Sequence, residues 1–411
     1  MLAPMATTAR TILALGGAGF VGRHAIATLR VLEPDASIVI VDRDGEAAAR
    51  AAEEHGVRGV ALDVTDEAAL AAALSEADVV MNTVGPYFRF GVPILRAAIA
   101  AGCHYVDVCD DWEPTVEMLK LDERARAAGV TAVIGMGISP GVSNLLARLA
   151  VEELDVAREV FTGWLLEGAR PEVIGPEPSA ATVHGIEQLT GTIRVWRDGR
   201  FVEEKPVRKT AVHYPGLSPA YGFTIGHPEP ITLPRRFPAL ERSLNLMVTD
   251  GATALALRSL GRFVDAGWLS KRTLARWAER LEGAGGEDMD AEQVIGAIDR
   301  GELPLPPIFA SASGERDGAE ASVGATITAT PPGGMGGATG IPLGVGVSLL
   351  LNGLVETRGV CAPEAAVEPR AFFDRLARHC RPARPGMDEL VLLTRSWERR
   401  TLAKAWRDTV G

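Results

Sequence analysis

The stretch that decides how this chain folds is Thr11-Ile12-Leu13-Ala14-Leu15-Gly16-Gly17-Ala18-Gly19-Phe20-Val21-Gly22. Its apolar start predicts a strand, and the amphipathic residues after it predict a helix. The G-x-G-x-x-G pattern between them permits a tight turn, close approach of a pyrophosphate to the backbone, and close packing of helix on strand. We expect the dinucleotide contacts from this turn to be Gly17, Ala18, Gly19, Phe20, Val21 and Gly22.

Strand and helix candidates then alternate as far as residue 135, with strands at 37–41, 59–62, 78–82, 104–108 and 131–135. This alternation predicts an α/β fold, with an N-terminal Rossmann domain built on a doubly wound parallel sheet. From about residue 160 the strand candidates are longer and alternate in polarity, which predicts a second α+β domain. The expected domains are 1–140 (Rossmann), 141–340 (substrate and dimerisation) and 341–411 (a C-terminal segment returning to the Rossmann domain). Glycine-rich stretches at 283–290 and 331–340 are expected to be loops.

The second strand candidate ends in Asp42, whose carboxylate is placed to bind the adenosine ribose and to repel the 2′-phosphate of NADP. Asp42 favours NAD, but Arg43 leaves NADP possible, since a guanidinium there is able to receive that phosphate. The ends of the third and fourth strands are expected to border adenine and the nicotinamide ribose, through Asp63 and Val64 and through Asn82, Thr83, Val84, Gly85 and Pro86. For Asp63 and Asp66, helix capping is an equal alternative.

Composition narrows the class of protein. A net charge of −11 over 411 residues argues against a nucleic-acid partner. The four cysteines lack metal or disulfide-framework spacing, so we expect no metal and a cytoplasmic protein. No apolar run approaches the roughly 18 residues of a spanning helix, and 341–354 is expected to be a buried helix, so no membrane partner is expected.

Several later segments carry a family resemblance. They are Asn82-Thr83-Val84-Gly85-Pro86-Tyr87, residues 97–103 running into His104-Tyr105-Val106-Asp107, Gly137-Ile138-Ser139-Pro140-Gly141, residues 339–351 with Gly353, and Gly359-Val360-Cys361-Ala362-Pro363-Glu364. Together they resemble the saccharopine dehydrogenase (saccharopine reductase and lysine 6-dehydrogenase) family. The resemblance implies an NAD(P)-dependent oxidoreductase that oxidises an amine or reduces an imine of an amino acid or polyamine, and a homodimer. Where many members have Asp before Pro-Gly, this chain has Ser139.

Such chemistry needs a proton relay for nitrogen. Asp107, at the end of the fifth strand candidate, is the first candidate for the catalytic group, and Tyr105 and Asp110 are the next. Asp111, Ser139, Pro140 and Gly141 are expected in the substrate wall. If the substrate is a carboxylic acid, one or two of Arg194, Arg197, Arg235 and Arg236 are expected to clamp it. The alternatives without a catalytic role are helix capping for the aspartates and core packing for the tyrosine.

Two other functions stay open. Relatives of this family include trans-acting enoyl reductases, which reduce carbon–carbon double bonds, and a dinucleotide sensor would bind cofactor without turnover. Short-chain dehydrogenase chemistry is disfavoured, because none of Tyr87, Tyr105, Tyr214 and Tyr221 begins a Tyr-x-x-x-Lys motif.

Overall fold

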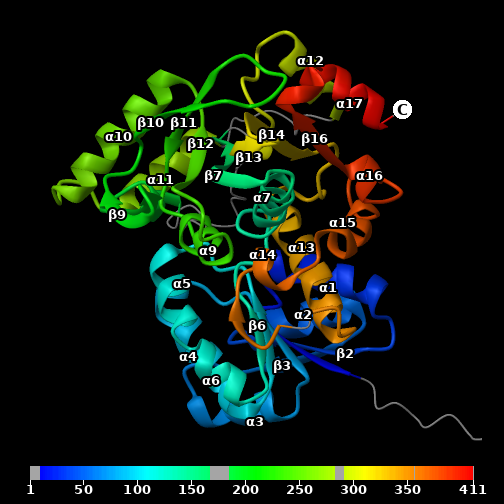
Figure 1. Ribbon diagram of the computed structural model, residues 1–411. Coiled ribbons are helices and arrows are strands. Elements are labelled where there is room, and N and C mark those ends of the chain that lie inside the picture. The colour runs from blue at the N-terminus through cyan, green and yellow to red at the C-terminus, as the bar shows by residue number, and fades with distance from the viewer. Residues whose placement is uncertain (1–9, 167–184, 283–290, 356, 411) are drawn as a thin grey trace, which may run out of the picture.

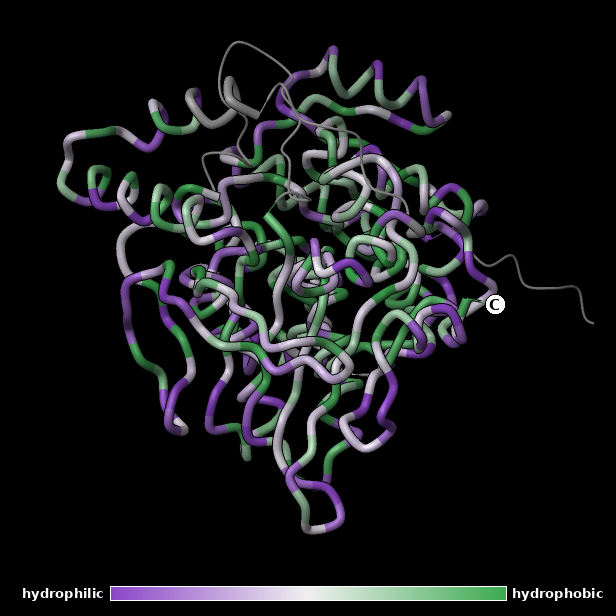
Figure 2. Tube along the Cα trace, turned by 90° about the horizontal axis from the view of Figure 1, so that it is seen from above, coloured by the Kyte–Doolittle hydropathy of each residue, from purple (hydrophilic) through white to green (hydrophobic). Residues whose placement is uncertain are grey.

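The computed structural model describes residues 10–166, 185–282, 291–355 and 357–410, which form two sheets stacked end to end (Figure 1). The predicted loop at 283–290 lies outside these residues. Hydrophilic segments lie mostly along the outside of the chain trace and hydrophobic ones toward its middle (Figure 2). One cluster of buried side chains runs from Ile12 in the first sheet through Leu145 to Val323 in the second. The two sheets therefore share a continuous core.

The first sheet has the order β15-β6-β5-β4-β1-β2-β3, and each of its pairings is parallel. Its strands are β1 (Thr11–Leu15), β2 (Ser37–Asp42), β3 (Arg58–Ala61), β4 (Val79–Asn82), β5 (His104–Asp107), β6 (Thr131–Val133) and β15 (Gly359–Cys361). Its helices are α1 (Phe20–Leu32), α2 (Gly45–His55), α3 (Glu67–Ser75), α4 (Tyr87–Ala101), α5 (Trp112–Leu119) and α6 (Asp122–Ala127). This arrangement confirms the predicted Rossmann sheet. The strand order reverses between β1 and β4, which is where such sheets bind ligands.

The second sheet has the order β10-β11-β12-β7-β13-β14-β16, with β8 paired to β12 and β9. Only the β12–β7 pair is parallel among the described pairings of this sheet. Its strands are β7 (Val156–Leu165), β8 (Ile193–Arg197), β9 (Arg200–Glu204), β10 (Lys209–Val212), β11 (Ala220–Thr224), β12 (Arg242–Val248), β13 (Ile308–Arg316), β14 (Ala319–Ile327) and β16 (Val391–Arg395). The helices α7 (Val142–Glu152), α9 (Glu229–Arg236), α10 (Gly251–Asp265), α11 (Lys271–Glu282) and α12 (Ala291–Asp299) belong to this half. The predicted second α+β unit is confirmed.

The C-terminal segment returns to the first sheet, as predicted, through α13 (Gly334–Leu351) and β15. The prediction of a loop at 331–340 is wrong from Gly334 onward, because the helix begins there. Gly340 and Gly344 face α1, and a side chain at Gly344 would come within 2.8 Å of the Ala25 carbonyl oxygen. The glycines therefore serve close helix packing instead of a turn.

α13 is long and apolar enough to span a membrane, but 78% of it is buried in the protein, against α1 and the core. This is the buried helix predicted from the apolar run at 341–354.

The last residues depart from the prediction that 341–411 pack on the Rossmann sheet. After α14 (Pro363–Ala366), α15 (Pro369–Ala377) and α16 (Met387–Leu390), β16 pairs with β14 at the edge of the second sheet. The terminal helix α17 (Leu402–Val410) then packs on α12 and β16. Residues 391–410 thus cover the β14 edge of the second sheet. Pairing at that edge depends on tertiary structure, so the local sequence does not reveal it.

Candidate functional site

The glycine turn has the geometry that a pyrophosphate needs. Gly16 has a φ of 70°, and a side chain at Gly22 would come within 2.6 Å of Cα of Gly17, so α1 passes close to the strand it follows. No side chain caps the first turn of α1, which begins at Phe20 after Gly19. The amides of this turn and the positive end of the helix dipole therefore fit a bound phosphate.

The adenosine end of the predicted site is exposed at the ends of β2 and β3. Asp42 accepts a hydrogen bond from the Asp44 amide at 3.1 Å, and the exposed Arg43 follows it. Asp63 accepts hydrogen bonds from the amide and hydroxyl of Thr65, which lower its pKa, and the nearby guanidinium groups of Arg43 and Arg89 contribute to the same shift.

The two carboxylates of this loop differ in whether they cap the following helix. Asp66 caps α3 by accepting a hydrogen bond from the Ala69 amide, whereas the Asp63 carboxylate accepts from Thr65. Val64 packs on the core below the loop. Asp63 is therefore left at the surface beside the arginines.

The loop at 82–86 lies beside the glycine turn, at the reversal of strand order. The Thr83 hydroxyl donates to the Leu15 carbonyl at 3.0 Å, and a side chain at Gly16 would meet the Thr83 hydroxyl at 2.9 Å. Val84, Gly85 and Pro86 follow at or near the surface. Asn82 is buried, and its Oδ1 accepts from the Val84 amide. These residues fit a nicotinamide dinucleotide lying across β1 and β4.

Asp107 and Tyr105, two of the predicted catalytic residues, have no exposed surface. The Tyr105 hydroxyl donates to Oδ2 of Asp107 at 2.7 Å, and Oδ1 accepts from the amides of Cys109 and Gly135. Burial raises the pKa of Asp107 to about 6. Because both of its oxygens accept hydrogen bonds, this carboxylate links the ends of β5 and β6 and holds the loops that follow them in position. Their catalytic role stays a prediction.

Asp110 and Asp111 lie just beyond this network. Gln188 donates from Nε2 to the carbonyl and to the carboxylate of Asp110, each at 3.2 Å. Asp111 precedes α5 and is 5% exposed, and its carbonyl accepts from the Thr115 hydroxyl. Both residues follow β5 at the carboxyl edge of the first sheet, and Asp110 contacts the second domain through Gln188.

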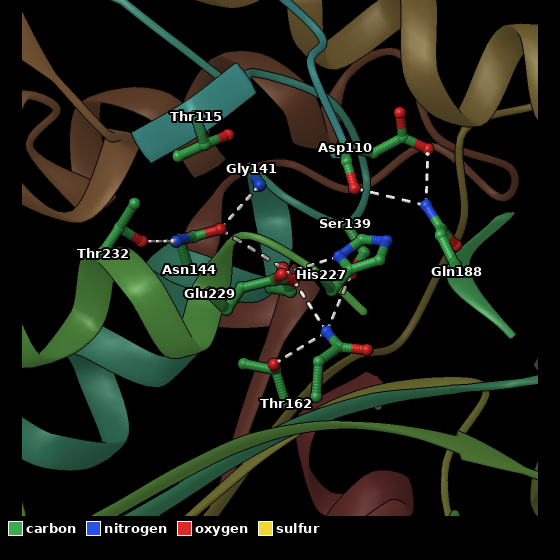
Figure 3. A network of polar contacts seen from close by, with 12 residues as sticks. Asp110, Thr115, Ser139, Gly141, Asn144, Thr162, Gln188, His227, Glu229 and Thr232 are labelled. Atoms are coloured by element: carbon green, nitrogen blue, oxygen red, sulfur yellow. Dashed lines mark hydrogen bonds and ion pairs between the residues drawn. The ribbon is translucent and has the colours of Figure 1, made fainter. Parts of the chain in front are cut away.

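The predicted substrate wall Ser139-Pro140-Gly141 follows β6 and leads into α7. Of the three, only Ser139 is partly exposed. Its hydroxyl donates to Oε1 of Glu229 at 2.6 Å, and the Ser143 hydroxyl donates to the same oxygen at 2.7 Å (Figure 3). The wall is thereby joined to α9 of the second domain.

Glu229 is the centre of a buried polar cluster at this junction, shown in Figure 3. Its Oε2 lies 2.7 Å from Nδ1 of His227, and its Oε1 also accepts from Nδ2 of Asn245 at 2.9 Å. Burial alone would raise the pKa of Glu229, but His227 and the serine hydroxyls hold it below its ordinary value. An ionised Glu229 carboxylate whose Oε2 lies within hydrogen-bond distance of the His227 ring is the arrangement these contacts favour.

Behind Glu229, Asn144 links the cluster to the C-terminal segment. Its Nδ2 donates to Oε2 of Glu364 at 2.8 Å and to the Thr232 hydroxyl at 3.3 Å. Glu364 has no exposed surface, and burial raises its pKa to about 7. Sequence reasoning did not single out Glu229 or Glu364 as site residues. Their spacing carries no local motif that would have found them.

Among the described residues, no group of three or more His, Cys, Asp or Glu side chains is arranged to hold a metal ion. Of the four arginines considered as carboxylate clamps, Arg194 and Arg197 are paired with Glu203 and Glu204. Arg235 and Arg236 lie at the exposed end of α9.

Comparison with known proteins agrees with this architecture. Residues 12–133 match the family model of the saccharopine dehydrogenase NADP binding domain. An L-glutamate-forming, NADP-dependent saccharopine dehydrogenase of Schizosaccharomyces pombe is 30% identical over 40% of this chain and 38% of its own length. A trans-acting enoyl reductase of Mycobacterium leprae is 26% identical over 34% of this chain and 36% of its own. The chain thus spans well under half the length of these curated relatives.

A solved structure extends the likeness in fold to nearly the whole chain. The apo L-glutamate-forming saccharopine dehydrogenase of Saccharomyces cerevisiae superposes with a TM-score of 0.62 and covers 94% of this chain and 99% of its own, at 17% identity. At 17% sequence identity, this likeness shows a shared fold alone. Together with the match over 12–133, it confirms the predicted dinucleotide-binding domain and the predicted resemblance of this chain to the saccharopine dehydrogenase family.

Proposed function

We propose that this protein is an NADP-dependent oxidoreductase that moves hydride to or from a carbon bonded to nitrogen in a small amine or amino acid. The observation that carries the proposal is the buried His227–Glu229 pair, which lies between the domains with Ser139 bound to it. Ser139 follows β6, and the loop at 82–86 follows β4, which is separated from β6 by β5 in the same sheet. Ligands of such sheets lie at this carboxyl edge.

The pair suits the proton that accompanies hydride transfer. The nicotinamide, when bound, accepts hydride from carbon or returns it. Oxidation of an amine also releases a proton from nitrogen. In this proposal a neutral His227 takes that proton, and Oε2 of Glu229 stabilises the resulting imidazolium through Nδ1. In the reverse direction the imidazolium returns the proton to nitrogen. Ser139 and Ser143 keep Glu229 ionised by donating to its other oxygen.

The preference for NADP rests on the exposed guanidinium groups at the adenosine end. Arg43 directly follows Asp42, and both Arg43 and Arg89 lie near enough to Asp63 to lower its pKa. Two guanidinium groups suit a 2′-phosphate, which binds arginine through charge-assisted hydrogen bonds. The family model and the saccharopine dehydrogenases that match are also named for NADP.

Enoyl reduction is the second candidate, because three of the similar curated proteins carry that name. An acyl chain requires an apolar channel. The side chains gathered around Glu229 are instead polar, namely Ser139, Ser143, Asn144, Thr162, His227 and Asn245. These polar side chains favour a small polar substrate over an acyl chain.

The proposal is tested by steady-state assays of NADP⁺ reduction with a panel of amines and amino acids, and of NADPH oxidation with enoyl thioesters. Turnover of at least one amine, lost in Glu229→Gln and kept in the surface control Glu241→Gln, is the expected result. Turnover of enoyl thioesters alone would replace the proposal with the enoyl reductase function. Dinucleotide binding without any turnover would support the sensor.

A further inference from the structure

A cavity lies outside the dinucleotide region, at the β15 edge of the first sheet. It has a volume of about 420 Å³ and opens between α6, α9 and the start of α14. Its lining includes basic, acidic and hydroxyl side chains, namely Arg126, Arg235, Arg236, Asp122, Glu364 and Thr232. A cavity of this size accommodates a small metabolite.

The mouth of the cavity is positively charged. Arg126 is paired through Nε with Asp122. Arg236 has its nearest carboxylate, Glu152, at 4.0 Å, and no ion pair of Arg235 occurs among the residues that the structure describes. Both are exposed and adjacent at the end of α9. Two guanidinium groups so placed suit a carboxylate.

The inner wall carries a buried carboxyl group. Glu364 lines the cavity but has no exposed surface. Its Oε2 accepts from Asn144, whereas its Oε1 is buried without a hydrogen-bond donor in the described part of the chain. A buried acceptor without a donor is costly, and a ligand N–H group would remove that cost. The Thr232 hydroxyl lies on the same wall.

We propose that this cavity binds a small α-amino acid, with its carboxylate on Arg235 and Arg236 and its ammonium group on Oε1 of Glu364. A plain dicarboxylate would match the arginines but would meet the Glu364 carboxyl without offering a donor. A diamine would match Glu364 but not the arginines. Only a zwitterion satisfies both ends of the cavity.

This site goes beyond the proposed oxidoreductase function and needs no cofactor. Asn144 lies between the two, because its amide donates to Thr232 and Glu364 while the adjacent Ser143 donates to Glu229. Binding is therefore measurable without hydride transfer, so that failure of either proposal leaves the other standing.

The test is isothermal titration calorimetry of the full chain, without dinucleotide, against the common amino acids. For any that bind, the deaminated carboxylic acid is titrated as well. We expect at least one amino acid to bind, and its deaminated analogue to bind at least about tenfold more weakly. Glu364→Gln and the double substitution Arg235→Ala, Arg236→Ala should each weaken amino-acid binding by about tenfold or more.

The exposed Arg258 on α10 provides the control, since Arg258→Ala should leave binding unchanged. The arginine substitutions are at the surface and leave the core intact. They therefore test the proposal even if the buried substitution Glu364→Gln prevents folding. Absence of binding by every amino acid at millimolar concentration would overturn the proposal. Binding that survives both sets of substitutions would also overturn it, because the ligand would then occupy another site.

Discussion

Oε2 of Glu229 lies 2.7 Å from Nδ1 of His227, and the two side chains are 0% and 3% exposed. Removing one partner of a buried charged pair leaves the other uncompensated. Glu229→Gln should therefore lower kcat by about 10²-fold or more, the usual contribution of general acid–base catalysis. It should also remove one limb of the pH–rate profile.

The control for this prediction is NADPH affinity, measured by fluorescence titration, which should be unchanged in Glu229→Gln because the residue lies away from the glycine turn. A variant that keeps full kcat and an unaltered pH profile would show that the pair has a purely structural role.

Arg43→Ala should weaken NADPH binding and leave NADH binding nearly unchanged, because only the former has a 2′-phosphate. Loss of a charge-assisted hydrogen bond of about 1.5–3 kcal/mol predicts a roughly 10- to 100-fold rise in the Kd for NADPH. Arg50→Ala, on the exposed face of α2, is the matched control. Equal effects on the two cofactors would refute a phosphate contact at Arg43.

Tyr105→Phe separates catalysis from positioning. The Tyr105 hydroxyl donates to Asp107 and accepts from Nδ2 of Asn82. Its removal leaves buried partners unsatisfied, so unfolding in urea should show a loss of about 1–3 kcal/mol. If the residue only positions, the shape of the pH–rate profile should stay as in the parent chain. A lost limb in that profile would instead restore Tyr105 to the proton relay.

Glu364 should make stability fall as pH rises. Its pKa is raised from an ordinary value of 4.5 to about 7, so between these values the folded chain binds more protons than the unfolded chain. The associated stability is fully present below 4.5 and is lost as pH passes 7. Glu364→Gln removes this dependence.

The difference in unfolding free energy between Glu364→Gln and the parent should therefore shift in favour of the variant by on the order of 3 kcal/mol from pH 4 to pH 8. Urea unfolding at the two pH values checks this. A difference that does not change with pH would contradict the raised pKa.

Gly340→Ala tests the contact of α13 with α1. The added methyl group would meet the Val21 carbonyl and the His24 side chain, so overpacking should cost about 1–3 kcal/mol. Gly251→Ala on α10 is the control, since a methyl group there meets nothing within 4 Å. Because α1 carries the glycine turn, Gly340→Ala should also weaken NADPH binding.

The sequence predicted the dinucleotide turn because its determinants are local. The run from Gly17 to Gly22 encodes the turn, and the alternating segments after it encode the sheet. The polar cluster could not be predicted in this way, since Ser139 and Glu229 are 90 residues apart and meet only when α9 packs beside α7. Its residues show no periodicity that separates them from ordinary core polar groups.

The glycines near 340 misled for a related reason. Low helix propensity indicated a loop, but the packing of α13 on α1 favours small side chains and overrides that propensity. The burial of Asp107 could not be predicted either, because one of its amide donors, Gly135, follows a different strand and reaches it only in the folded sheet. The other donor is the amide of Cys109.

The central claim is hydride transfer at a carbon–nitrogen bond, and isotope transfer tests it most directly. An amine that supports NADP⁺ reduction is prepared with deuterium on the carbon that bears nitrogen, and the NADPH formed is analysed by mass spectrometry. The account predicts one deuterium in the nicotinamide of the product, together with a primary isotope effect on single-turnover rates. NADPH without deuterium, or incorporation only when an enoyl thioester is reduced by deuterated NADPH, would contradict it.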